Sequence, residues 1–157
     1  MRLETARFGV LDYEKTDIIW MVRGFLGFED LKRFVFISPK EQEPFKWYQS
    51  LENPDIAFLL IEPRFLKPDY VVDINPKDIS ILGAKSRDDI TYFLLVTIPG
   101  GKPQMMSANL KAPLAINPKN NQGAQLVLGD SGYHAAHPIF GKIDKRPSHA
   151  PPAKGKA

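Results

Sequence analysis

The amino-acid sequence predicts an all-β fold, a small antiparallel β-barrel-like domain with one short helix. About eight to ten short runs of β-branched and aromatic residues are separated by Gly- and Pro-containing turns, which is typical of small barrels and sandwiches. The length of 157 residues fits a single domain, and 43% hydrophobic residues suffice for a core. Closure into a barrel would remove the exposed edges that such strands otherwise leave.

The strand-like runs follow one another along the chain, with turn residues between them. Several are apolar on both faces, as central strands are, and the run at residues 90–97 is the most strand-like. Residues 45–51 fit a helical face or a strand face equally well. The predicted strands are residues 3–10, 17–22, 33–38, 56–61, 70–73 and 90–97, followed by a strand that ends in Met105-Met106.

A β-hairpin with a longer loop is predicted near the end of the chain. Residues 107–117 are small and apolar and contain Pro113, which indicates a kinked strand. Residues 122–128 alternate between two faces, and Val127 lies on the face opposite Leu126. A polar turn separates the two runs.

The single short helix is predicted at residues 76–83. Asn75 can cap its first turn, and Pro76 fits the first helical position. Gly83 fits the position just past its end.

Motifs in both halves of the chain resemble the FliW family of bacterial flagellar assembly factors. The opening half carries Gly24-Phe25-Leu26-Gly27-Phe28-Glu29, Pro44-Phe45 and Gln49-Ser50, and the closing half carries Asn109-Leu110-x-Ala112-Pro113-x-x-Ile116-Asn117, Gln125-x-Val127-Leu128, Tyr133 and His137-Pro138. The ordered set covers about residues 3–140 and favours a strand at residues 45–51. Two features depart from the family: Trp47-Tyr48 replaces smaller aliphatic residues, and the chain continues beyond Phe140.

The resemblance implies a non-enzymatic protein of the cytoplasm that acts in flagellum biogenesis. FliW proteins bind the carbon storage regulator CsrA, an RNA-binding translational repressor of flagellin synthesis, and they also bind flagellin, as a chaperone would. The two partners compete, so free flagellin leaves CsrA unopposed. We therefore expect CsrA and flagellin as partners, no cofactor, and a monomer when the chain is free. The alternative is a small-barrel ligand- or flavin-binding protein, which the visible absorbance of the purified protein would reveal.

The net charge of +3 arises at the end of the chain. Residues 142–157 hold five basic side chains and one acidic side chain, so residues 1–141 carry a net charge of −1. A nucleic-acid binder should show a basic patch on its folded body, so we expect no direct binding of nucleic acid. We expect residues 141–157, which lack an apolar face, to form a disordered basic tail beyond a domain of residues 1–140. Truncation after Phe140 should then leave the melting temperature nearly unchanged.

The sequence also indicates the cellular compartment of the protein. The chain has no cysteine, which excludes disulfides and thiolate metal sites and fits a reducing cytoplasm. The first residues contain no long apolar run, so we expect no signal peptide. No apolar segment approaches the roughly 20 residues that span a bilayer, and we expect no membrane partner.

Three local patterns resemble catalytic or metal sites, and we assign chemistry to none of them. Gly129-Asp130-Ser131-Gly132 spells the nucleophile motif of trypsin-like proteases, but every histidine follows the serine, the reverse of the order in those enzymes. His134 and His137 lack a convincing third metal ligand. Asp88 and Asp89 are expected in a solvated turn before the strand at residues 90–97. We expect no catalytic residue, no cofactor site and no metal ligand.

Eight residues are candidates for contact with a protein partner. Residues 52–89 hold eight acidic and five basic side chains, whereas residues 1–51 hold eight of each. CsrA must carry basic surface to hold RNA phosphates, so a face of negative potential built around residues 62–89 would oppose it; an ordinary solvated surface would have the same composition. The candidates are Asp69, Asp73 and Asp78 on this face, with Phe45, Gln49, Asn109, Asn117 and Gln125 elsewhere.

The uncharged candidates have a structural alternative. The amides of Asn109, Asn117 and Gln125 can satisfy backbone groups where the strands bend, and a role in partner contact can coexist with that. Phe45 lies in an aromatic cluster with Trp47-Tyr48 that is core by default and can also anchor an interface.

Overall fold

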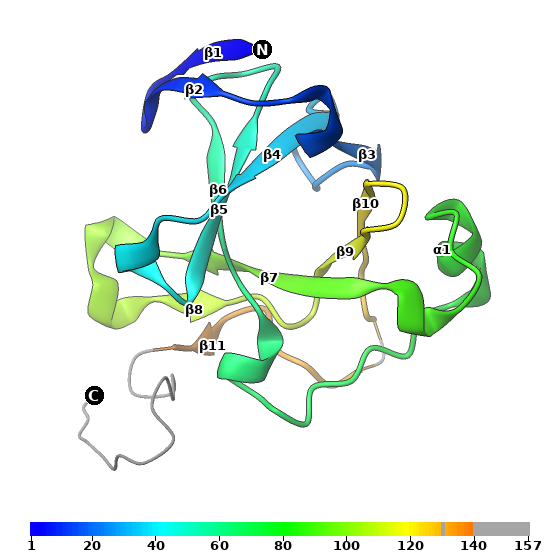
Figure 1. The fold of residues 1–157 in the computed structure, drawn as a ribbon. Coiled ribbons are helices and arrows are strands. Elements are labelled where there is room, and N and C mark those ends of the chain that lie inside the picture. Colours follow the sequence, from blue (N-terminus) through cyan, green and yellow to red (C-terminus); the bar gives the residue numbers. More distant parts are fainter. Residues whose placement is uncertain (130, 140–157) are drawn as a thin grey trace.

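The computed structural model describes residues 1–129 and 131–139, and the strands close into a barrel (Figure 1). Strands β3 to β7 follow one another as an antiparallel meander. Strand β9 pairs with both β7 and β10, and β10 pairs in parallel with β3, which completes the ring. The barrel strands are β3 (Ile19–Arg23), β4 (Arg33–Ile37), β5 (Phe45–Ser50), β6 (Ala57–Ile61), β7 (Thr91–Thr97), β9 (Leu114–Asn117) and β10 (Gln122–Gln125). The predicted all-β barrel with one short helix is confirmed.

Shorter elements surround the barrel. Strands β1 and β2 form a hairpin at one end, and β8 and β11 extend the sheet beyond β7 (Figure 1). These strands are β1 (Arg2–Thr5), β2 (Gly9–Asp12), β8 (Ser107–Ala108) and β11 (His137–Pro138). The α-helix of the described residues is α1 (Pro76–Ile81), and short 3-10 turns lie at Lys15–Asp17, Lys40–Gln42, Pro63–Phe65, Arg87–Asp89, Pro99–Gly101 and Pro103–Met105. Among the described residues, no helix is long and apolar enough to cross a membrane.

The barrel interior is aromatic. The rings of Phe34 and Tyr48 stack with centroids 4.4 Å apart, and Phe25 meets both rings edge-on at 5.6 and 5.9 Å. Phe34 on β4 and Tyr48 on β5 are both fully buried. Burial raises the pKa of the Tyr48 hydroxyl well above its ordinary value, and that hydroxyl contacts the sulfur of Met21 at 3.3 Å. These rings lie in one core cluster with aliphatic side chains such as Leu60 and Leu114, and their burial favours closure of the barrel.

A second apolar cluster lies between the outside of the barrel and the α1 segment. Leu82, just after α1, is fully buried, and Val72 and Ile74 before α1 are nearly so. The cap predicted for the helix is confirmed, because the side chain of Asn75 accepts a hydrogen bond of 2.8 Å from the backbone N–H of Lys77.

Gly83 ends the helix in the conformation that the sequence predicts. Its φ of +66° lies in the left-handed region, where a side chain is strained. The confirmed start and end of α1 fix where the chain turns back toward β7 (Figure 1).

Two predicted strands are wrong, and three are only partly right. The kinked strand predicted at residues 107–117 is two separate strands, β8 and β9, and the strand predicted at residues 122–128 ends at Gln125. Residues 70–73 alternate as a strand does, with Val72 inside, but they pair with no strand of the described chain. The run that was expected to end at Met105-Met106 is a 3-10 turn at Pro103–Met105, because proline cannot donate to a ladder, and the strand begins only at Ser107. Residues 3–10 form a hairpin, not one strand, with Gly9 at a φ of +65°.

The ambiguous stretch at residues 45–51 is a strand, as the family resemblance favours. Phe45–Ser50 forms β5, in which Phe45 pairs with Ile61 of β6 and Tyr48 with Phe36 of β4. The predicted domain end at residue 140 and the predicted disordered tail at residues 141–157 lie outside the described residues.

Candidate functional site

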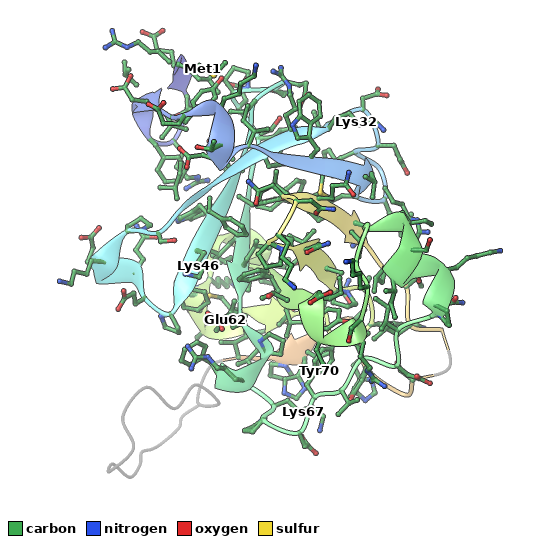
Figure 2. The ribbon with its side chains drawn as sticks, turned by 45° about the vertical axis from the view of Figure 1, so that its right-hand side comes forward. Met1, Lys32, Lys46, Glu62, Lys67 and Tyr70 are labelled. Atoms are coloured by element: carbon green, nitrogen blue, oxygen red, sulfur yellow. The ribbon has the colours of Figure 1, made fainter. Side chains whose placement is uncertain are left out.

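Residues 62–89, around which the negative face is predicted, form a long connection on the outside of the barrel. The chain leaves the barrel after β6, passes through the turn at Pro63–Phe65 and through α1, and returns at β7 (Figure 1). Figure 2 shows the side chains of this segment, with Glu62, Lys67 and Tyr70 labelled on its first part. The hydroxyl of Tyr70 donates a hydrogen bond of 2.7 Å to the carbonyl of Leu110, which ties the loop to the segment between β8 and β9.

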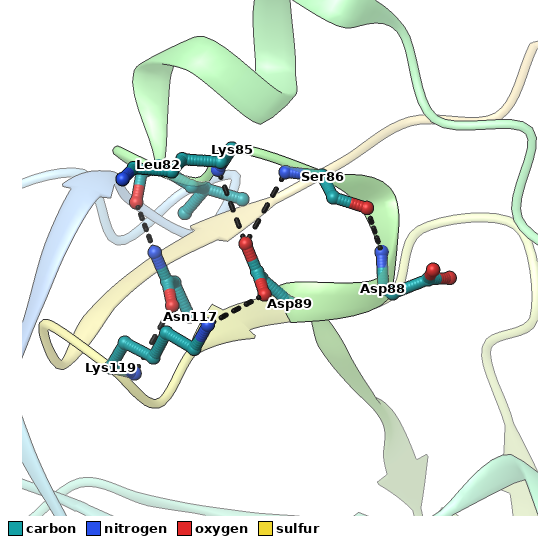
Figure 3. Close-up of polar contacts among 7 residues, drawn as sticks. All are labelled: Leu82, Lys85, Ser86, Asp88, Asp89, Asn117 and Lys119. Atoms are coloured by element: carbon teal, nitrogen blue, oxygen red, sulfur yellow. Dashed lines mark hydrogen bonds and ion pairs between the residues drawn. The ribbon is translucent and has the colours of Figure 1, made fainter.

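The turn between β9 and β10 holds the end of α1. The side-chain amides of Asn117 and Asn120 both donate to the carbonyl of Leu82, at 2.9 and 3.0 Å, and Figure 3 shows the first of these bonds. The last carbonyls of a helix lack partners within it. Two amides from a distant hairpin therefore hold the chain where the helix ends.

Asp89 fastens the same segment to that turn. Its carboxylate pairs with the ammonium of Lys119 at 3.0 Å and accepts backbone hydrogen bonds from Lys85 and Ser86 at 3.2 and 3.3 Å (Figure 3). The hydrogen bonds from Lys119 and then Lys85 lower the pKa of Asp89. Asp88 is exposed and points away from Asp89 (Figure 3), so the two carboxylates do not face a common site. The turn expected before β7 is present, but only Asp88 is solvated, because the Asp89 side chain is 17% exposed.

The three acidic candidates have different surroundings. Asp78 on α1 forms an ion pair of 3.0 Å with Arg23 of β3. Asp69 pairs with Lys67 at 3.3 Å, and its side chain is 80% exposed. Asp73 is exposed and forms no ion pair or hydrogen bond with another described residue. The structure therefore leaves Asp73 as the least compensated carboxylate of the three.

Asp73 and Asp78 share a groove, which we call the Asp73 groove, whereas Asp69 does not line it. Its volume is about 530 Å³. The side chains of Val71 and Val127 stand at its walls and are 61% and 59% exposed. The groove lies between residues 71–75 with the start of α1 on one side and residues 126–129 on the other, and Ser131 and Tyr133 also line it.

The exposed valines of the groove are functional candidates that the sequence analysis did not select. The alternation of residues 122–128 already placed Val127 on the face opposite the buried Leu126, so that signal was present. No signal marked Val71, which was assigned only to the predicted strand at residues 70–73. Trp20 on β3 is an exposed aromatic residue that the sequence did not mark as a candidate. Its side chain is 51% exposed, and the guanidinium of Arg33 lies 5.9 Å from its ring centroid.

Gln125 and Asn109 join backbone segments, as the structural alternative predicts. The side chain of Gln125 accepts from the N–H of Leu26 at 2.8 Å and donates to the carbonyl of Ala112 at 3.2 Å. The oxygen of Asn109 accepts from two successive backbone N–H groups, those of Lys111 and Ala112, at 3.0 Å each. Contact of these amides with a partner stays a prediction.

Gln49 has the same kind of role deeper in the molecule. Its side chain is fully buried, and its amide nitrogen donates to the carbonyls of Ser50, Pro54 and Ile56 at 2.9, 3.2 and 3.1 Å. One amide thus closes the loop between β5 and β6. The burial of Gln49, Asn117 and Gln125 leaves them little surface for a partner, so their predicted binding role would require the barrel to open locally.

The aromatic candidate Phe45 and its neighbour Trp47 have different surroundings. Phe45 is half-buried and packs against the apolar cluster that contains Ile61 and Leu110. Trp47 donates its indole N–H to the side chain of Gln42 at 2.8 Å, and the guanidinium of Arg7 lies 4.4 Å from its ring centroid. The tryptophan that departs from the family pattern therefore fastens the N-terminal hairpin to β5.

The patterns that resembled catalytic and metal sites have structural partners. The hydroxyl of Ser131 donates to the carbonyl of Leu128 at 2.9 Å and accepts from the N–H of Tyr133 at 3.1 Å, as expected of a turn. His137 lies on β11 opposite Ala108. The described residues contain no group of three or more His, Cys, Asp or Glu side chains placed to hold a metal ion.

Comparisons with known proteins agree with the motifs. Residues 2–139 match the family model of the FliW protein. The chain is 42% identical to the flagellar assembly factor FliW of Caldanaerobacter subterraneus subsp. tengcongensis over 96% of this chain and 100% of that one, and 38% identical to that of Bdellovibrio bacteriovorus over 93% and 83%. A crystal structure of the flagellar assembly factor FliW superposes with a TM-score of 0.80 at 28% identity, over 88% of this chain and 96% of that one. The barrel, its short helix and these matches together place the chain in the FliW family.

Proposed function

We propose that this chain is a cytoplasmic flagellar assembly factor that binds CsrA and flagellin and opposes the repression of flagellin translation by CsrA. Its relatives bear the name flagellar assembly factor. In this proposal the chain acts by binding rather than by catalysis, needs no cofactor, contacts neither nucleic acid nor membrane, and is a monomer when free.

The observation that carries the proposal is the composition of the Asp73 groove. Exposed apolar side chains of Val71 and Val127 stand beside the carboxylates of Asp73 and Asp78, and the described residues that line the groove include no lysine or arginine. Protein interfaces commonly combine an apolar centre with a charged rim. A regulator that holds RNA must be basic at its RNA site, so a negative surface attracts it and competes with the phosphates for the same positive potential.

The proposal is tested by reversing the charge of the acidic surface. Replacing Asp69, Asp73 and Asp78 together with Lys should weaken CsrA binding ten-fold or more at low salt, which is about 1.4 kcal/mol. The loss should shrink at high salt, because screening removes the steering contribution. Calorimetry or surface plasmon resonance at two ionic strengths measures both effects.

A matched control makes the same change of charge at the N-terminal hairpin. Glu4, Asp12 and Asp55 are exposed and lie at or beside β1 and β2, and their replacement with Lys should leave CsrA binding within about two-fold. Thermal melting must show that both triple variants fold, since the first one loses the Arg23–Asp78 pair. Unchanged CsrA binding in a folded Asp69, Asp73 and Asp78 variant would move the interface elsewhere, first to the hairpin from Asn109 to Gln125.

A further inference from the structure

One wall of the Asp73 groove is a chain segment with the alternation of a strand but no partner strand. Val72 and Ile74 point into the core, whereas Val71 and Asp73 are exposed. The N–H of Val71 donates to the hydroxyl of Tyr133 at 3.0 Å, and the carbonyl of Val72 accepts from the guanidinium of Arg87 at 3.3 Å. Side-chain groups thus hold this wall in place where a strand ladder is absent.

The opposite wall presents an open backbone edge. The N–H groups of Leu126 and Leu128 donate to the carbonyls of Pro113 and Lys111, at 2.9 and 2.7 Å. Backbone groups of successive residues in an extended segment point to opposite sides, so the N–H and C=O of Val127 point away from those carbonyls. Neither group has a hydrogen-bond partner among the described residues. A Cβ placed at Gly129 would meet no atom within 4 Å, which shows that space is open beside this edge.

The side chains of the groove select the kind of peptide that would pair there. Asp73 forms no ion pair with another described residue, whereas the Asp78 carboxylate is paired with Arg23. The exposed faces of Val71 and Val127 favour apolar side chains. A strand presents alternate residues to opposite faces, so one extended segment can offer basic and apolar side chains in turn.

We infer that the Asp73 groove binds an extended segment of a partner protein, which pairs with Val127 as an added β-strand and places a lysine or arginine beside Asp73. Main-chain hydrogen bonds to an open edge supply affinity in this mode of recognition, and the side-chain contacts supply specificity. The inference deepens the proposed function, on which it rests for the role of this surface in partner binding.

The test uses a defined probe and the full chain. The probe is an acetylated and amidated hexapeptide that alternates lysine and valine, titrated into the isotope-labelled protein while amide chemical shifts are recorded. Saturable shifts should concentrate at residues 71–75 and 126–129, with a dissociation constant below about 1 mM. The same peptide with N-methyl groups on alternate backbone amides, which cannot pair as a strand, should bind at least ten-fold more weakly.

Two substitutions at Val127 distinguish the contribution of its backbone N–H to binding from that of its side chain. Val127→Pro removes the N–H that faces the groove and should weaken binding of the probe ten-fold or more. Val127→Ala keeps that N–H and should weaken binding less than about three-fold. If Val127→Pro does not fold, the N-methylated peptide gives the same information with the protein unchanged.

The results distinguish this inference from the proposed function. Equal affinity for the probe and its N-methylated forms, or no saturable binding of the probe, would overturn strand addition. If CsrA binding still depends on Asp69, Asp73 and Asp78 in that case, the proposed function stands without it. Strand addition of the probe with CsrA binding unaffected by the triple variant would instead support the groove as a peptide site and reject the proposed role of the acidic surface.

Discussion

The barrel interior and the α1 segment are held in place by different interactions. Inside the barrel, Phe25, Phe34 and Tyr48 are almost completely excluded from solvent and contact one another through their rings. Helix α1 itself contains no buried residue. It is fastened by apolar residues on either side of it and by polar contacts, among them the two amide bonds to the carbonyl of Leu82.

This difference separates the stability of the molecule from the placement of its candidate surface. Apolar burial contributes most of the free energy of folding and is shared by many residues. Each polar contact contributes less free energy, but the polar contacts determine where the α1 segment lies on the barrel. Loss of one of these polar contacts should therefore disturb the placement of the α1 segment more than the folding of the barrel.

The largest expected loss of stability follows from removing one buried aromatic ring from the barrel interior. Phe34→Ala should lower the free energy of unfolding by about 3–5 kcal/mol, because it leaves a cavity against the stacked ring of Tyr48. Denaturant unfolding should show a lower midpoint with an unchanged slope. Phe28→Ala is the matched control, since that ring is 41% exposed and packs on Phe58 at the surface. Equal losses in the two variants would contradict the division between interior and surface.

Removal of the buried amide that holds α1 should have a smaller and local effect. Asn117→Ala should lower the free energy of unfolding by about 1–2 kcal/mol, because the Leu82 carbonyl and the N–H of Lys119 each lose a partner. Hydrogen exchange should accelerate at residues 76–84 more than in the barrel strands. Asn120→Ala removes an exposed amide from the same carbonyl and should have a weaker effect. Uniform acceleration throughout the barrel would show that α1 is not a separate unit.

The glycine after α1 provides a third test of the same attachment. Gly83→Ala should cost about 1–2 kcal/mol for the left-handed conformation, and it should also displace the side chain of Asn120, whose nitrogen would lie 2.6 Å from the new Cβ. Gly101→Ala has a similar φ of +71° with open space around it. Thermal melting should rank Gly83→Ala as the more damaging variant; the reverse order would show that the contact with Asn120 is unimportant.

The smallest effect is expected at Asp89 and should depend on pH. The carboxylate is held in its charged form by hydrogen bonds, so its pKa in the folded chain lies below the ordinary value of 3.8. Its contribution to stability is therefore present above that value and is lost as the pH falls through the lower folded pKa. Asp89→Asn should melt below the parent protein at pH 7, and the two melting temperatures should converge at acidic pH. A gap that persists at acidic pH would assign the effect to packing.

Local features of the fold could be predicted from the sequence, whereas long-range pairings could not. The cap at Asn75 and the glycine at Gly83 each depend on near neighbours in the chain. The parallel pairing of β10 with β3 depends on contacts between distant segments, which no local pattern records. The strand expected at residues 70–73 is absent for the same reason: its alternation is real, but the topology provides no neighbouring strand.

The candidate site was predictable in composition but not in arrangement. The excess of acidic residues at 52–89 indicated a negative surface, and Asp73 and Asp78 do share one groove. Asp69 lies outside its lining, and Lys67 and Arg23 compensate two of the three carboxylates. The role of amides at Asn109, Asn117 and Gln125 in satisfying the backbone was foreseen, but the bond from Asn117 to Leu82 spans a distance in sequence that residue type does not specify.

The closing of the ring has a consequence for how the molecule is made. Strands β3 to β7 can pair in the order in which they leave the ribosome, because each joins the one before it. The other edge of β3 pairs with Gln122–Gln125, roughly 100 residues later in the chain. Until those residues have been synthesised, β3 keeps an open edge that can pair with another chain. A nascent chain thus remains prone to association through most of its synthesis, and a product that stops before residue 122 never escapes that state.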